Sequence, residues 1–115
     1  MELTIHSDFL VRTIKENFNK TYPFLKLEFY RDGDKHKMLR DAERLYIKGN
    51  ATVMINIEAA RTLKELKNDI ENTTGYTAQI FRRSCNVWIE TSLTDDWSLE
   101  RQNKEGQLFN MFLTR

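Results

Sequence analysis

The pattern of apolar and polar residues predicts a strand, a helix and a second strand in the first 30 residues. Apolar and polar residues alternate over 2–6 and again over 25–30, as in strands with one buried face. Between them, apolar residues recur at helical spacing until Pro23, which has no backbone N–H and cannot continue a helix. Ser7 and Asp8 are expected to cap its first turn through their side-chain oxygens. The expected helical stripe is Val11, Ile14 and Phe18.

A second strand-helix-strand pattern follows after a less regular stretch. Asp32-Gly33-Asp34 predicts a turn, and Leu39, Ala42 and Tyr46 predict a short helix near 38–46 that ends at Gly49-Asn50. Residues 52–57 alternate as a strand. Thr62 and Glu65 then form a capping-box sequence, and Gly75 supplies a helix stop. The stripe of this helix is Leu63, Leu66 and Ile70.

The C-terminal third predicts a hairpin and a last helix. Residues 76–83 and 86–91 are β-rich and flank a turn at Ser84-Cys85. A helix is expected to start near Asp96 or Ser98 and to run to about Phe112, with Gly106 weakening its middle.

The two strand-helix-strand units match each other at a shift of 52 residues. Both helical stripes and both stop signals coincide, and four positions are identical: Lys15/Lys67, Thr21/Thr73, Phe29/Phe81 and Arg31/Arg83. At this shift Leu25 and Leu27 align with the polar residues Thr77 and Gln79. One closing strand must therefore slip by a residue or carry a bulge to keep its apolar face inward. A duplicated unit predicts the ferredoxin-like β-α-β-β-α-β plan, with both helices on one face of a single sheet. The alternative is a small α+β fold with separate two- or three-strand units.

These patterns predict one α+β domain over 1–115. Its pseudo-repeat units cover about 2–31 and 52–83, and residues 84–115 extend it by a hairpin strand and a helix. The inward strand positions are expected to be Leu3, Ile5, Leu25, Leu27, Val53, Ile55, Ala78 and Ile80.

Composition narrows the function classes. The chain has 115 residues and a net charge of +1, which gives no overall attraction to nucleic acid or anionic membranes. A single cysteine excludes an intramolecular disulfide, and no stretch has the length or apolarity of a signal peptide or membrane helix. We therefore expect a cytoplasmic protein.

The amino-acid sequence of the second half resembles that of a known protein family. TLKELKNDIENTTGY, QIFRRSCNVWIET and TDDWSLERQNKEG are similar to a family of small uncharacterised bacterial proteins, most densely over 62–106. That family usually has glycine in the hairpin before Asn-Val-Trp, where this chain has Cys85. The resemblance implies a related α+β fold, and no established activity, cofactor or site comes with it.

Candidate catalytic and metal-binding groups are few. His6 and His36 are 30 residues apart without a ligand pattern, and Asp95-Asp96 is better placed to cap a helix than to act as an acid–base pair. Cys85 lies beside Arg82 and Arg83, but no base or oxyanion site accompanies it. We expect no enzyme activity, no cofactor and no metal.

The sheet face opposite the expected core is the best candidate surface. Three interpretations compete for it: coverage by the last helix through Leu108, Met111 or Phe112, a protein partner or self-association, and stacking of nucleic-acid bases. The mixed basic segment 35–48 is expected to be a solvated helix face. The predicted function is a non-enzymatic protein-interaction module, which a homodimer would also satisfy, with single-stranded nucleic-acid binding as the alternative. The candidate interaction surface is Tyr30, Arg31, Met54, Phe81, Arg82, Arg83 and Trp88.

Overall fold

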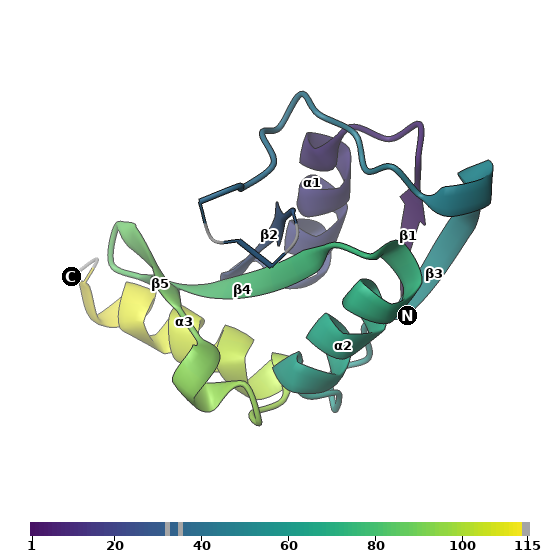
Figure 1. Cartoon of the computed structure of the whole chain (residues 1–115). Coiled ribbons are helices and arrows are strands. Elements are labelled where there is room, and N and C mark those ends of the chain that lie inside the picture. Colours follow the sequence, from purple (N-terminus) through teal and green to yellow (C-terminus); the bar gives the residue numbers. More distant parts are fainter. Residues whose placement is uncertain (32, 35, 114–115) are drawn as a thin grey trace.

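The computed structural model describes residues 1–31, 33–34 and 36–113, without the side chains of residues 50 and 111–113 (Figure 1). The described residues form five strands and three α-helices, with short 3-10 turns at Lys48–Asn50 and Ser92–Thr94. The elements are β1 (Glu2–His6), α1 (Val11–Thr21), β2 (Leu25–Tyr30), β3 (Thr52–Asn56), α2 (Leu63–Thr74), β4 (Thr77–Ser84), β5 (Val87–Glu90) and α3 (Leu99–Leu113).

The described strands form two antiparallel sheets, so the α+β class is confirmed. β1 pairs with β3 in one sheet, and the other has the order β2-β4-β5. The single four-stranded sheet expected of a ferredoxin-like plan is not what these residues form, and the pairing corresponds to the alternative with separate strand units. The physical reason is that alternation determines which face of a strand is buried, but not which strand lies beside it.

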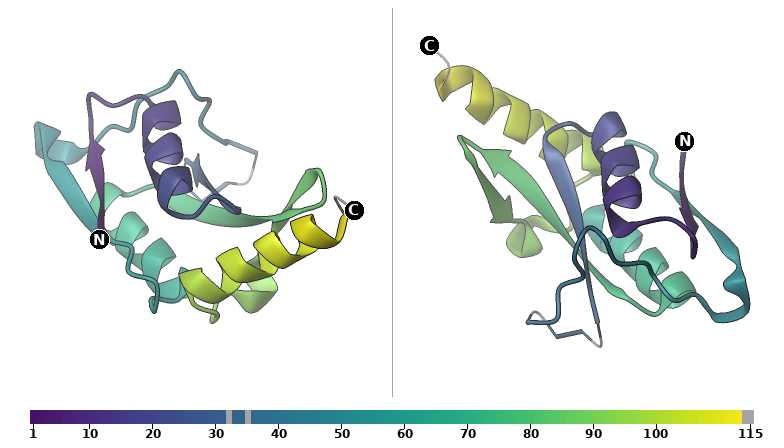
Figure 2. Two further views of the ribbon diagram at one scale, coloured as in Figure 1. Left: turned by 180° about the vertical axis from the view of Figure 1, so that it is seen from behind. Right: turned by 90° about the horizontal axis from the view of Figure 1, so that it is seen from above.

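The helices connect the two sheets. α1 packs against β1 and β2, and α2 packs against β3 and β4. From above, α1 lies between the β2-β4-β5 sheet and the β1-β3 ribbon (Figure 2). The helices therefore do not lie side by side on one sheet face, as expected from the sequence. Their predicted stripes are nevertheless fully buried: Val11, Ile14 and Phe18 on α1, and Leu63, Leu66 and Ile70 on α2.

Strand alternation identifies the core face correctly. The expected inward residues are buried except Val53, which is half-buried and packs against the core. In β4 the buried positions are Ala78 and Ile80, one residue beyond the positions Thr77 and Gln79 that the repeat alignment gives for Leu25 and Leu27.

The helix starts differ in how they satisfy their free N–H groups. At α2 the capping box is confirmed: Glu65 N–H donates to Thr62 Oγ1 and Thr62 N–H donates to Glu65 Oε1, both at 3.1 Å. α1 begins at Val11, after Leu10, and receives no side-chain cap, so the expected capping by Ser7 or Asp8 is wrong. Main-chain carbonyl groups from the segment after β2 take that role.

That segment, residues 38–47, has two isolated β-bridges and a turn at residues 41–42 where a short helix was expected. Met38 and Arg44 form bridges to Tyr30 and Leu10. Its buried residues alternate, and Tyr46 is 79% exposed. Backbone pairing to two neighbours outweighs the weak helical spacing. The buried residues are Leu39, Leu45 and Ile47.

The two halves of the chain make the same contacts at their helix starts. In each half, a segment that follows the closing strands crosses the helix N-terminus and accepts two backbone hydrogen bonds. A lysine one turn into each helix pairs with an aspartate of that segment, at 2.8 Å for Lys15–Asp41 and 3.4 Å for Lys67–Asp95. We call residues 38–47 the first strap and residues 92–99 the second strap. The backbone bonds run from Val11 to Glu43, Arg12 to Asp41, Leu63 to Trp97 and Lys64 to Asp95.

α3 packs on β4 close to the end of β2. Ser98 caps it, since Arg101 N–H donates to Ser98 Oγ at 3.1 Å. Gly106 permits close contact, because a Cβ there would lie 2.8 Å from Phe24 Cβ. The glycine that weakens the helix pattern is therefore a packing position.

Candidate functional site

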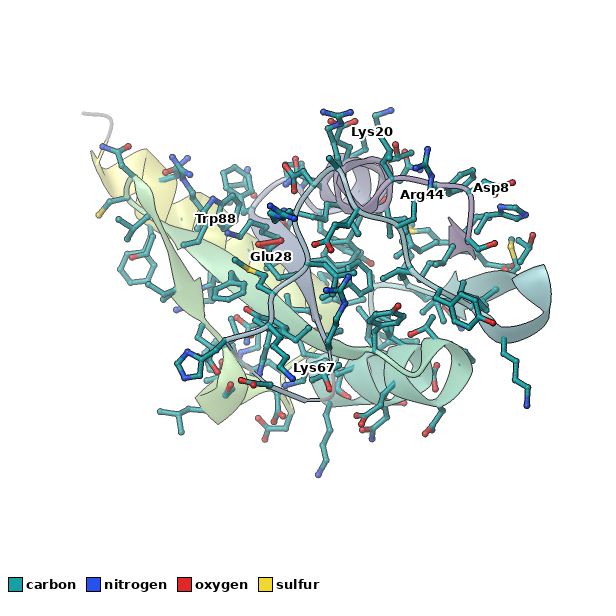
Figure 3. All side chains as sticks on the ribbon, turned by 45° about the horizontal axis from the view of Figure 1, so that its top comes forward. Asp8, Lys20, Glu28, Arg44, Lys67 and Trp88 are labelled. Carbon is teal, nitrogen blue, oxygen red and sulfur yellow. The ribbon has the colours of Figure 1, made fainter. Side chains whose placement is uncertain are left out.

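One face of the β2-β4-β5 sheet collects aromatic and cationic side chains. The register pairs Lys26 with Phe81 and Arg83 with Trp88, and alternation places all four opposite the Leu27–Ile80 face. We call Lys26, Phe81, Arg83 and Trp88 the Trp88 cluster. Its side chains are half-buried. Trp88 and Glu28, which also lies on this face, are labelled in Figure 3.

Both cations of the Trp88 cluster lie over the same indole ring. Lys26 Nζ is 4.9 Å from the Phe81 ring centroid and 5.6 Å from that of Trp88. The guanidinium carbon of Arg83 is 5.2 Å from the Trp88 ring centroid. At these distances the ring quadrupoles attract and orient the cations. The face therefore offers an ordered combination of apolar area and positive charge.

Neither cation has a close carboxylate partner among the described residues. Lys26 Nζ is 4.0 Å from Glu28 Oε2, and Arg83 donates from Nε to the Cys85 carbonyl at 3.0 Å. Glu28 is instead paired at 2.5 Å with Lys15, which also contacts Asp41. Burial alone would lower the pKa of Lys15, but hydrogen bonds to Asp41 and Glu28 outweigh it and leave that pKa raised. Lys15 is thus fully engaged, and the cations left for a partner are Lys26 and Arg83.

A hollow of about 200 Å³ lies between α1 and Trp88. Lys26 contributes the cation at its border and Trp88 an apolar wall. Its lining residues are Lys15, Glu16, Asn19, Lys26 and Trp88.

The structure brings together only part of the surface predicted from the sequence. Phe81, Arg83 and Trp88 lie together as expected. Tyr30 shares their face but is buried, and burial raises the pKa of its phenol. Arg31 follows β2 and pairs with Glu43 at 2.6 Å.

Two predicted members belong elsewhere. Met54 is in the β1-β3 sheet, where it is 54% exposed and accepts a contact from Thr4 Oγ1. Arg82 occupies the opposite face of β4, because adjacent strand residues point to opposite sides. There its Nη1 donates to Gln102 of α3 at 3.0 Å, and its guanidinium lies 5.9 Å from the Trp97 ring centroid.

The position of Arg82 also settles which face α3 covers. Its contact with Gln102 places α3 on the side opposite the Trp88 cluster, so the expectation that the last helix packs over this face is wrong for the described side chains. Leu108 is 49% exposed on α3, while Met111 and Phe112 lie outside the described side chains.

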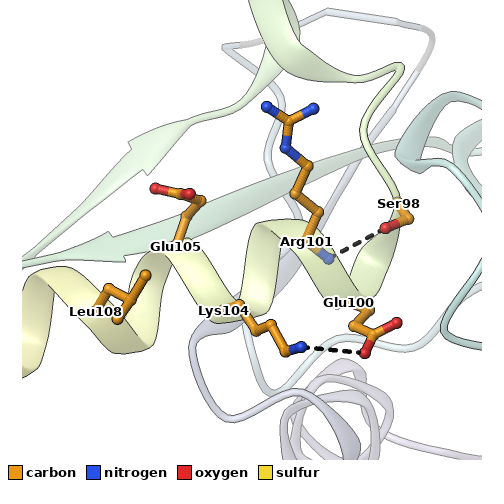
Figure 4. Close-up of a pocket in the computed structure, with 6 residues that line it drawn as sticks. All are labelled: Ser98, Glu100, Arg101, Lys104, Glu105 and Leu108. Atoms are coloured by element: carbon orange, nitrogen blue, oxygen red, sulfur yellow. Dashed lines mark hydrogen bonds and ion pairs between the residues drawn. The ribbon is translucent and has the colours of Figure 1, made fainter.

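α3 carries a second hollow of about 330 Å³ (Figure 4). Its charged groups are occupied locally: Glu100 pairs with Lys104 at 3.4 Å, and Arg101 lies 3.7 Å from the Trp97 ring centroid. This hollow lacks the free cations of the Trp88 cluster and is the weaker candidate.

Sequence reasoning missed the part of the site contributed by α1. Lys15, Glu16 and Asn19 approach β2 and β5 only through the way α1 packs, and no local pattern marks them as surface partners of Trp88. Lys26 lies between the expected inward residues Leu25 and Leu27, so alternation gives its face, but its contact with Trp88 depends on the β2-β4-β5 order.

The groups considered for catalysis are dispersed. Asp95 pairs with Lys67 instead of capping α3, and Cys85 is exposed in the hairpin turn. Within the described residues, no group of three or more His, Cys, Asp or Glu side chains has an arrangement suited to a metal ion. None of the helices in this part of the chain combines the length and apolarity needed to cross a membrane. Comparison of the chain with protein-family models, curated proteins and solved structures finds no match.

Proposed function

We propose that the chain is a non-enzymatic protein-interaction module that binds through the Trp88 cluster. The observation that carries the proposal is the stacking of Lys26 and Arg83 over a half-buried indole on a sheet face that α3 leaves uncovered. Tryptophan and arginine are the residues that most often dominate binding energy at protein interfaces. The partner is another protein or a second copy of this chain.

Single-stranded nucleic acid is the second candidate. Aromatic rings beside cations are also the means by which bases stack on proteins. The surrounding charge favours a protein, because Glu16 lines the hollow beside the cluster and repels a run of phosphates. The net charge of +1 likewise provides little basic excess.

The test compares Trp88→Ala with Met54→Ala. Met54 is a matched control, since it is an exposed apolar residue on the other sheet. Self-association is measured by sedimentation equilibrium, and peptide binding by selecting a random twelve-residue library on phage against the full chain. Sedimentation with a thymidine oligonucleotide tests the second candidate.

Trp88→Ala is expected to weaken association or peptide binding by about 2 kcal/mol or more, and Met54→Ala to leave it unchanged. Circular dichroism establishes that both variants fold. A chain that neither self-associates nor selects peptides dependent on Trp88 contradicts the proposal. Binding of the oligonucleotide that Trp88→Ala abolishes would favour the second candidate.

We also propose that the two halves arose by duplication of a β-α-β-strap unit. The paired contacts Lys15–Asp41 and Lys67–Asp95 support this, as does the shared helix-start pattern. A reducing, cytoplasmic setting is part of the same proposal, because the only cysteine is free and exposed.

A further inference from the structure

We infer that the Trp88 cluster binds an acidic segment of a partner protein, with a carboxylate placed on Lys26 at the hollow between α1 and Trp88. The inference rests on the proposed function and adds the chemistry of the partner. Three features carry it: the weakly paired cations, the shape of the hollow and the disposition of the acidic residues around it.

The weakly paired cations point to a carboxylate. Lys26 Nζ makes one long ion pair at 4.0 Å and no hydrogen bond to a described residue, although its side chain is only 30% exposed. Its three N–H donors are therefore poorly satisfied, while the neighbouring Lys15 is saturated by Glu28 and Asp41. A carboxylate brought to Lys26 would form a charge-assisted hydrogen bond in a partly desolvated position.

The hollow supplies an apolar wall beside that cation. Trp88 forms one side and the α1 residues Glu16 and Asn19 form the other. A side chain entering here packs its stem against the indole while its head group reaches Lys26. Arg83, on the central strand β4 directly opposite Trp88, offers a second position for a carboxylate of the same segment.

The acidic residues around the hollow select a peptide over a polyphosphate. Glu28 is held by Lys15, and Glu16 lies on the rim. A phosphate backbone would place several negative charges near these groups, whereas a peptide can place isolated carboxylates on the two cations and apolar groups elsewhere. The charge complementarity is therefore local, which suits an acidic segment with interspersed apolar residues.

The test analyses the composition of the phage-selected peptides and their dependence on Lys26. Selected peptides are synthesised with a fluorescent label and titrated with wild type, Lys26→Met, Lys26→Arg and Lys64→Met. Met keeps the apolar stem over Phe81 and Trp88, and Arg keeps the charge. Lys64 is the matched control, because it is an exposed lysine on α2.

We expect the Trp88-dependent peptides to be enriched in Asp and Glu. Lys26→Met should raise their dissociation constant about tenfold or more, with Lys26→Arg restoring most of the affinity and Lys64→Met having no effect. Replacing the peptide's acidic residues by Asn or Gln should cause a similar loss.

Two results overturn the inference and leave the proposed function standing. Trp88-dependent peptides without acidic enrichment, or with equal affinity for Lys26→Met, would mean that the cluster binds apolar groups alone. Self-association through Trp88 that no acidic peptide displaces would identify the partner as a second copy of the chain. Peptides that bind Trp88→Ala as tightly as wild type contradict both proposals.

Discussion

Cys85 is held in a backbone conformation that an L-residue with a side chain adopts at a cost. Its φ is +58°, in the left-handed region, at the turn between β4 and β5. Glycine has no Cβ and reaches this region without penalty. Cys85 is therefore a strained residue in the turn that leads into β5, the strand that carries Trp88.

Replacing Cys85 with glycine should therefore stabilise the hairpin. Cys85→Gly is expected to raise the free energy of unfolding by roughly 0.5–1 kcal/mol, the strain relieved being partly offset by the greater freedom of glycine in the unfolded chain. Urea titration measures the difference. Cys85→Ala keeps the strain and serves as the control; equal stability of the Gly and Ala variants would show that the turn is not strained.

At the level of single residues, burial could be predicted well from the sequence. Phe18 and Ile70 are buried because helical spacing identifies their face unambiguously. Arg82 was misassigned because two adjacent arginines were grouped by charge, whereas alternation sends them to opposite faces. The conformation of Cys85 left only an indirect signal, since glycine is the usual residue in such a turn.

At the level of elements, the starts of α1 and α2 show two solutions to the same requirement. The first four N–H groups of a helix have no partner within the helix. α2 satisfies them with its own capping box and with carbonyl groups of the second strap, while α1 relies on carbonyl groups of the first strap and of Leu10. The capping box could be read from the sequence, but the strap contacts could not, because their acceptors lie about 30 residues away.

Thr62→Ala is expected to destabilise the fold by about 1 kcal/mol. The substitution removes the acceptor of Glu65 N–H and one partner of the Glu65 carboxylate. The free energy of unfolding, measured in urea, reports the loss. Thr73→Ala near the other end of α2 is the matched control; equal losses in both variants would argue against the capping box as the stabilising feature.

The helix expected at 38–46 does not form, and the reason is again a contact with residues distant in the sequence. Leu45 and Ile47 alternate and are buried, and this short strand-like pattern was outweighed in the sequence by the wider spacing of Leu39, Ala42 and Tyr46. Only pairing with Leu10 and Tyr30 distinguishes the two conformations.

At the level of the whole molecule, the straps link each helix to a distant part of the chain. In the first strap, a hydrogen bond from Lys15 lowers the pKa of Asp41, and the Arg40 N–H and the Arg31 guanidinium lower that of Glu43. The partner strand of each strand was not predictable, because the two units have similar alternation. Strand order is a property of the whole molecule, and so is the hollow beside Trp88, which depends on that order.

The strap carboxylates predict a loss of stability in acid. A carboxyl group whose pKa is lowered by folding contributes stability above its unfolded pKa of about 4, and this contribution is lost as the pH falls toward the lower folded value. The free energy of unfolding should therefore decrease as the pH is lowered below about 4. Glu43→Gln should make that fall shallower, whereas an unchanged slope would mean that Glu43 does not contribute.

The central claim is that Trp88 lies on an uncovered sheet face, directly beside the two cations Lys26 and Arg83. Quenching of tryptophan fluorescence by iodide and by caesium tests it most directly, in a Trp97→Phe variant that leaves Trp88 as the only tryptophan. We predict that iodide quenches Trp88 more strongly than caesium, because Lys26 and Arg83 attract the anion, and that Lys26→Met with Arg83→Met removes the difference. Resistance to both ions would show that the face is covered, and equal quenching by both would show that it carries no positive potential.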